Sequence, residues 1–172
     1  MNSSSTASSN DVLLHHLLHF VDHVGDRLGL NVPPIAHIEQ LRSLPTGTLG
    51  RSLADFLEQE QLTPFQTGPR RKQLHDSVHV LTGYGADPIG EAEVQAFLLG
   101  AKFHPTNLLL VGGLLHVIHR CVAPLPLLNA TIRQRLWAAY WRGRHSLFDV
   151  DTWQPEAQWH LPLSQVQPLF RL

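Results

Sequence analysis

The sequence predicts an all-α fold: a single domain of about seven helices, with a metal site between two neighbouring helices. Apolar residues recur at helical spacing, Pro and Gly separate these segments, and neither strand alternation nor an internal repeat is evident. The length of 172 residues suits one domain. We expect residues 1–10 to form a disordered Ser-rich tail and residues 11–172 to form the domain.

Punctuating residues set the expected bounds of each helix. Thr48 is a suitable N-cap for the helix that follows it. Gly83 ends the helix that carries His75 and His79, and Asp87-Pro88 opens the helix after that. The expected helices cover residues 11–30, 36–43, 48–61, 70–82, 89–102, 106–121, 130–142 and 164–169.

Composition and charge exclude several classes of protein. The chain is 43% hydrophobic and 16% charged, which is typical of a globular domain. A formal net charge of -1 gives no surface for a polyanion, so we expect no nucleic-acid partner. The single cysteine, Cys121, excludes an intrachain disulfide and favours a reducing compartment.

Targeting signals are not evident in the sequence. Residues 1–10 lack the basic start and apolar core of a secretory signal. The longest apolar run, Leu108 to Leu115, is far shorter than the ~20 residues that span a bilayer. We therefore expect no signal peptide or transmembrane segment, and a cytoplasmic protein that can lie on the inner face of a membrane.

A cluster of metal-ligating residues begins at His75-Asp76 and continues through His79 to Glu91. Residues four apart share one face of a helix, so His75 and His79 can point at the same atom. Asp76 lies about 100° round the helix from His75, and Glu91 begins the following helix. A Gly-rich turn would let the two helices lie antiparallel and face each other. Two imidazoles and two carboxylates suit zinc, iron(II), manganese or cobalt better than copper(I), and magnesium is a further candidate.

Other interpretations of these histidines remain open on spacing alone. The pair could be a solvated face, a hydrogen-bonded core pair, or part of a metal-dependent phosphohydrolase, although no further matching ligand set is evident for the last. His15, His19 and His23 also recur at four-residue spacing, but they lie opposite the apolar stripe among acidic residues, which favours a solvated face.

A longer pattern resembles the coenzyme Q protein 4 family of ubiquinone biosynthesis. Residues 44–51, LPTGTLGR, resemble its LPxGTLGR signature, and the chain reproduces its HDxxH, eleven residues, then E motif. The similarity covers residues 44–172. It departs from the family pattern at Leu53, where a tyrosine is common, and at Gln154, where a glutamate is common.

The resemblance implies a metal-dependent protein that acts on a polyprenylated hydroxybenzoate, by oxidative decarboxylation and hydroxylation at the carboxyl-bearing ring carbon. His75, Asp76, His79 and Glu91 would then be the metal ligands. Arg51 is a candidate for binding an anionic head group, with a structural cap contact as the alternative. Catalytic residues are not identified by the motif.

A non-catalytic scaffold is the second hypothesis, in which the metal anchors a prenyl lipid and the protein organises other quinone-biosynthesis enzymes. Trp137, Tyr140 and Trp141 lie near several arginines in one expected helix. Burial or contact with a second copy in a homodimer is the favoured interpretation of this aromatic group. Peripheral contact with a membrane is the alternative.

Overall fold

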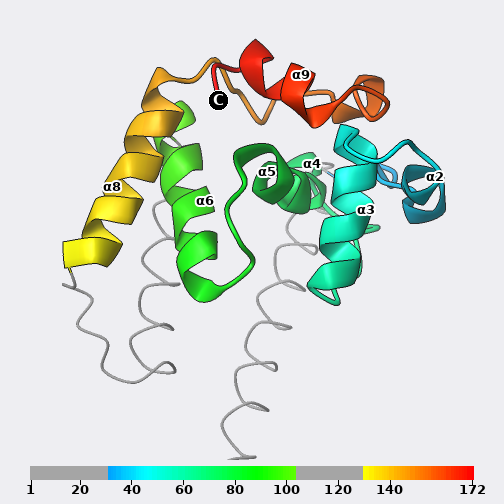
Figure 1. The fold of residues 1–172 in the computed structure, drawn as a ribbon, viewed down its shortest axis with the longest axis horizontal. Coiled ribbons are helices and arrows are strands. Elements are labelled where there is room, and N and C mark those ends of the chain that lie inside the picture. Colours follow the sequence, from blue (N-terminus) through cyan, green and yellow to red (C-terminus); the bar gives the residue numbers. More distant parts are fainter. Residues whose placement is uncertain (1–30, 104–129) are drawn as a thin grey trace, which may run out of the picture.

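The computed structural model describes residues 31–103 and 130–172 as an assembly of helices (Figure 1). The prediction of an all-α fold is confirmed, because within these two ranges the strand-like pairing is limited to two isolated bridges. In chain order the elements are α2 (Ile38–Arg42), α3 (Leu49–Gln59), α4 (Arg70–Gln73), α5 (His75–Thr82), α6 (Pro88–Ala101), α8 (Ala130–His145), the 3-10 helix η1 (Pro155–Ala157) and α9 (Leu163–Leu169).

The core lies where α3, α5 and α6 meet the C-terminal segment. Figure 1 shows α6 and α8 side by side, α2 and α3 on the opposite flank, and α9 across one end. The side chains with almost no exposure come from α3, α5, α6, α9 and the junction of α4 with α5: Leu49, Leu53, Leu57, Leu74, Val78, Leu81, Val94, Phe97 and Val166. Apolar residues at helical spacing therefore face one shared interior, as expected.

Helices α6 and α8 run in the same direction at very short range. Glu93 near the start of α6 pairs with Arg135 near the start of α8. Further along, a Cβ atom placed on Gly143 would lie 2.0 Å from the carbonyl oxygen of Phe97. The absence of a side chain at Gly143 thus permits direct backbone contact between the helices.

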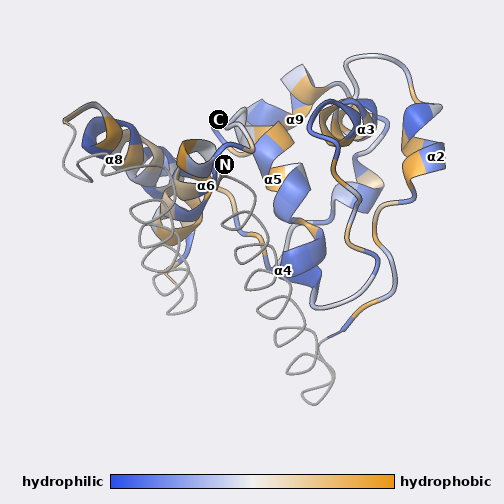
Figure 2. Cartoon of the chain, turned by 90° about the horizontal axis from the view of Figure 1, so that it is seen from below, coloured by the Kyte–Doolittle hydropathy of each residue, from blue (hydrophilic) through white to orange (hydrophobic). Residues whose placement is uncertain are grey.

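The helix expected over residues 70–82 is divided into α4 and α5, and in this respect the prediction was wrong. The break falls at Leu74, whose ψ of -8° lies off the ideal helical value. Helix α4 is hydrophilic along its length (Figure 2) and its arginines bind the C-terminal segment. Arg70 pairs with Glu156 at 2.6 Å, and Arg71 pairs with Asp151. These contacts orient α4 separately from α5.

The remaining helix predictions agree with the structure within a few residues. The helix expected to end at residue 142 continues to His145. Among the described residues, no helix has the length and hydrophobicity needed to cross a bilayer. The predictions for residues 1–30 and 104–129, including the three spaced histidines and Cys121, lie outside the described residues, and the single-domain boundary stays a prediction.

Candidate metal centre

Helix α5 presents the two histidines on one face and ends directly after them. Gly83 adopts the left-handed conformation, with φ of 78°, and its N–H donates to the carbonyl oxygen of His79 at 2.7 Å. A residue with a side chain would be strained at this φ, so glycine is the suitable end of the helix, as predicted.

Helix α6 begins one short turn later and carries Glu91. The Asp87 side chain accepts a hydrogen bond from the Ile89 N–H at 2.9 Å, and Pro88 occupies the first helical position. A Cβ atom on Gly90 would lie 2.0 Å from the Gly85 carbonyl oxygen. The small residue thus lets the connecting turn lie against the first turn of α6 and brings Glu91 close to α5.

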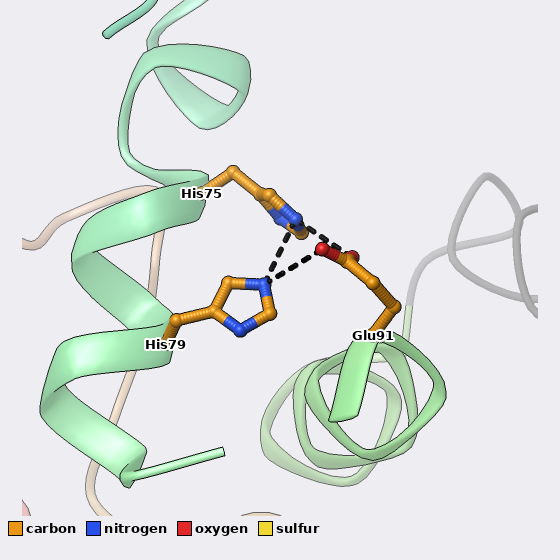
Figure 3. A group of neighbouring side chains, drawn as sticks. All are labelled: His75, His79 and Glu91. Atoms are coloured by element: carbon orange, nitrogen blue, oxygen red, sulfur yellow. Dashed lines mark hydrogen bonds and ion pairs between the residues drawn. The ribbon is translucent and has the colours of Figure 1, made fainter. Parts of the chain in front are cut away.

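The two helices cross, and the expected antiparallel arrangement was wrong. In Figure 3, α5 is seen from the side while α6 is seen along its axis. The turn between them is short, so α6 leaves at a steep angle and presents its N-terminal end to the face of α5. Glu91 therefore points towards both imidazoles.

The three donor atoms lie at mutual distances that suit one metal ion. His75 Nε2 is 3.0 Å from Glu91 Oε2, His79 Nε2 is 3.2 Å from Glu91 Oε1, and the two Nε2 atoms are 3.2 Å apart (Figure 3). With one atom taken from each residue, the three donors lie within 4.8 Å of one another. Ligands about 2.05 Å from a tetrahedral ion are themselves about 3.3 Å apart. Among the described residues, His75, His79 and Glu91 form a group able to hold a metal ion.

Backbone and aromatic contacts fix the orientation of His79. Its Nδ1 lies 3.1 Å from the Tyr84 carbonyl oxygen, which can only accept, so Nδ1 carries a hydrogen, and Nε2 would present a lone pair to a metal ion once its own proton is displaced. The Phe56 ring stacks on the imidazole at 5.6 Å. Neither contact is predicted by the sequence, because a main-chain carbonyl has no residue-type signature and Phe56 comes from α3.

The charge of the site is set by Glu91. Burial would raise the pKa of its carboxyl, but hydrogen bonds and attraction from His75 and His79 lower it to about 2. For His79 burial opposes protonation, yet the Glu91 carboxylate, the Tyr84 carbonyl and Asp76 raise the pKa of the imidazole. An ionised carboxylate and the two imidazoles beside it together form a suitable ligand set for a cation.

Asp76 lies near the three donors without joining their group. Its carboxyl is 8% exposed, and burial raises its pKa while His75 and His79 act in the opposite direction. The buried carboxyl thus lies within electrostatic range of the site. Direct ligation by Asp76 stays a prediction.

Arg51 forms structural contacts on α3. Its Nε donates to the Asp55 carboxylate at 2.6 Å, and its guanidinium donates to the Arg42 carbonyl oxygen at the end of α2 at 3.1 Å. These bonds are structural contacts at a helix end, which is the alternative to anion binding expected for Arg51 from the sequence. A role for Arg51 in binding an anionic group stays a prediction.

The aromatic group on α8 is largely exposed. Trp137 is 62% and Trp141 41% exposed, and their rings meet edge to face at 5.5 Å. The expectation of burial within the chain is thus wrong for these tryptophans, because the α8 face that packs on α6 is the one bearing Ala139 and Gly143. Contact with a second copy and contact with a membrane both stay predictions.

Comparisons with known proteins agree with the resemblance seen in the sequence. The rat ubiquinone biosynthesis protein COQ4 homolog is 30% identical over 95 residues, covering 41% of this chain and 36% of that protein. The zebrafish homolog, from Danio rerio, is 29% identical over 121 residues, covering 62% and 43%. The chain thus spans less than half of the curated relatives that it matches. No family model matches the chain.

A solved structure shares the fold. It is described as a putative ubiquinone biosynthesis protein from Nostoc punctiforme and superposes with a TM-score of 0.66 at 20% identity. The match covers 81% of this chain and 69% of the other. At this identity the similarity establishes the arrangement of the helices alone.

Proposed function

We propose, from the sequence similarity of this chain to COQ4 homologs, that it acts in ubiquinone biosynthesis on a polyprenylated hydroxybenzoate. We infer that one divalent ion, held by His75, His79 and Glu91 with Asp76 beside them, is required for this action. The proposed reaction is oxidative decarboxylation and hydroxylation at the carboxyl-bearing ring carbon.

The observation that carries the proposal is the gathering of two imidazole nitrogens and one carboxylate within 4.8 Å of one another. Three protein ligands leave positions open for water or substrate, as in catalytic rather than structural sites. Two histidines and one carboxylate are also the ligand set of non-haem iron(II) oxygenases. Iron, manganese or cobalt would supply redox chemistry, whereas zinc or magnesium would act through charge alone.

The protein residues contribute binding and charge. Glu91 offsets one of the two charges of a bound dication, so the site keeps an excess positive charge that favours an anionic ring carboxylate. Replacing the carboxyl by a hydroxyl releases CO2 and adds one oxygen atom to the ring. With dioxygen as oxidant, two electrons and two protons from a reductant convert the second oxygen atom into water.

Metal analysis followed by turnover tests the proposal. We expect about one equivalent of metal in protein purified without chelator, and loss of that metal in a folded His79→Ala, Glu91→Ala double variant. His160→Ala, which removes an exposed histidine outside the site, should keep the metal. A prenylated hydroxybenzoate labelled with ¹³C in its carboxyl should then release labelled CO2 only with the metal-loaded wild type. Equal absence of metal from wild type and double variant, after metal is supplied, would refute the proposal.

A non-catalytic prenyl-lipid-binding scaffold is the alternative function, and the exposed aromatic residues of α8 favour it. Trp137 and Trp141 lie beside basic residues, a combination that suits lipid head groups or a partner protein. This surface is a candidate for contact with a second copy, with other quinone-biosynthesis enzymes, or with the inner face of a membrane. A protein that binds metal and prenyl lipid but releases no labelled CO2 would support the scaffold.

A further inference from the structure

Gln95 on α6 is buried without a hydrogen bond for its amide oxygen. The residue is 7% exposed, and its Oε1 atom has no hydrogen-bond partner within the part of the chain that the structure describes. A buried acceptor left unpaired costs about 1–3 kcal/mol. Such atoms are few in native proteins, and each requires a physical reason.

A second buried glutamine shows how such a group is normally satisfied. Gln73 is 5% exposed, and its side chain accepts from the Ile35 N–H at 3.0 Å and donates to the Val32 and Gly68 carbonyl oxygens. Its amide therefore joins α4 to the neighbouring loop. Among the described residues, Gln95 Oε1 has no comparable partner.

The position of Gln95 on α6 places it on the side of the metal centre. Glu93 faces α8 through its pair with Arg135, and at about 100° per residue Gln95 lies about 200° from Glu93, on the opposite side. Glu91 is one turn before Gln95, and residues four apart lie on the same face. Side chains also lean towards the N-terminus of their helix, which directs Gln95 back towards Glu91.

We propose that Gln95 Oε1 accepts a hydrogen bond from a water molecule bound to the metal ion. The inference depends on the metal site of the proposed function. Its dimensions fit: four residues of helix rise about 6 Å. A metal–water bond of about 2.1 Å and a hydrogen bond of about 2.8 Å together span about 5 Å. Gln95 would thus orient the open coordination position without being a ligand itself.

The role has a distinctive thermodynamic consequence. In the metal-free protein Oε1 is an unpaired buried acceptor, so replacing Gln95 by leucine removes a cost and should leave the melting temperature unchanged or higher. In the metal-bound protein the same change removes the partner of the bound water. Removing a hydrogen-bond partner of a metal-bound group typically weakens metal affinity by 10–100-fold. Stability without metal and affinity for metal should thus respond differently.

Zinc titration calorimetry and thermal unfolding of the full chain test the inference. We expect Gln95→Leu to bind one equivalent of Zn²⁺ with a Kd about tenfold above wild type, and Gln95→Glu, which keeps an acceptor, to remain within about threefold of wild type. Metal-free Gln95→Leu should melt no lower than wild type, whereas the matched Gln73→Leu, which loses three hydrogen bonds, should melt lower.

Two results would overturn the role of Gln95 alone: a Kd for Gln95→Leu within twofold of wild type, or a metal-free melting temperature lowered as in Gln73→Leu. Binding by Gln95→Glu as weak as by Gln95→Leu would also overturn it, since the acceptor would then be irrelevant. Failure of the wild type to bind Zn²⁺ would instead overturn the metal site and this inference together.

Discussion

Replacing Gly143 by alanine should destabilise the protein, although alanine is the better helix former by about 1 kcal/mol. The added Cβ would lie 2.0 Å from the Phe97 carbonyl oxygen and 2.9 Å from the Ala101 nitrogen. Ordinary contact begins at 3.4 Å, so α8 would have to move by about 3.4 - 2.0 = 1.4 Å. Both obstructing atoms belong to the backbone, which cannot rotate away as a side chain can.

The magnitude follows from two opposing effects. Overpacking costs about 1–3 kcal/mol, and contact with backbone favours the upper end. Subtracting the gain in helix propensity leaves a net loss of about 1–2 kcal/mol. At about 2–4 °C per kcal/mol for a chain of this size, the melting temperature should fall by about 2–8 °C.

Ala138 supplies the matched control, because it is an exposed residue of the same helix. Ala138→Gly should cost about 1 kcal/mol through propensity alone. Guanidinium unfolding of both variants at one pH separates the two effects. If Gly143→Ala stabilised the protein by about as much as Ala138→Gly destabilised it, α6 and α8 would not be in backbone contact and the reasoning would be refuted.

Three further predictions concern the acid range, a helix cap and the metal. Hydrogen bonds from Arg71 and Lys102 lower the pKa of Asp151 to about 2 from 3.8, so its contribution to stability is present above about pH 4 and lost as pH falls towards 2. Asp151→Asn should therefore lower the urea midpoint at pH 6 more than at pH 3, and an equal effect at both values would contradict this ion pair. The Thr48 side chain accepts from the backbone N–H of residue 51 at 3.3 Å, so Thr48→Ala should cost about 1 kcal/mol in chemical unfolding, and no loss would exclude the cap. Because the pKa of His79 is raised, zinc must displace a proton from its imidazole, so zinc affinity should increase through and above pH 6.5. Calorimetry in buffers of different ionisation enthalpy measures the protons released. A zinc affinity independent of pH would argue against His79 as a ligand.

Helix ends and the shared face of His75 and His79 could be predicted from the sequence because short-range rules determine them, whereas the crossing of α5 and α6 could not. Thr48, Gly83 and Asp87 each act within a few residues, and all three occupy the expected caps. The pairing of His75 with His79 follows from helix geometry alone. These features depend on local conformation, which the sequence specifies directly.

Features that depend on distant parts of the chain could not be predicted in the same way. The break at Leu74 reflects ion pairs between α4 and the C-terminal segment, at Asp151 and Glu156, which lie 80 and 86 positions along the chain from their arginine partners. The stacking of Phe56 on His79 requires α3 to pack against α5. Neither contact has a spacing rule, so periodicity gives no indication of it.

The location of the candidate metal ligands explains why the site can be specified so locally. His75 and Glu91 are only 16 positions apart, and the turn that joins them is set by Gly83, Asp87 and Gly90. Substitutions elsewhere can therefore alter what lies around the open coordination positions while the ion stays bound. Phe56 belongs to α3 and Gln95 lies one helical turn beyond Glu91. Substrate choice would depend on residues such as these, which surround the site without belonging to the ligand motif. The motif alone thus predicts a group able to hold a metal ion better than it predicts the substrate of the proposed function.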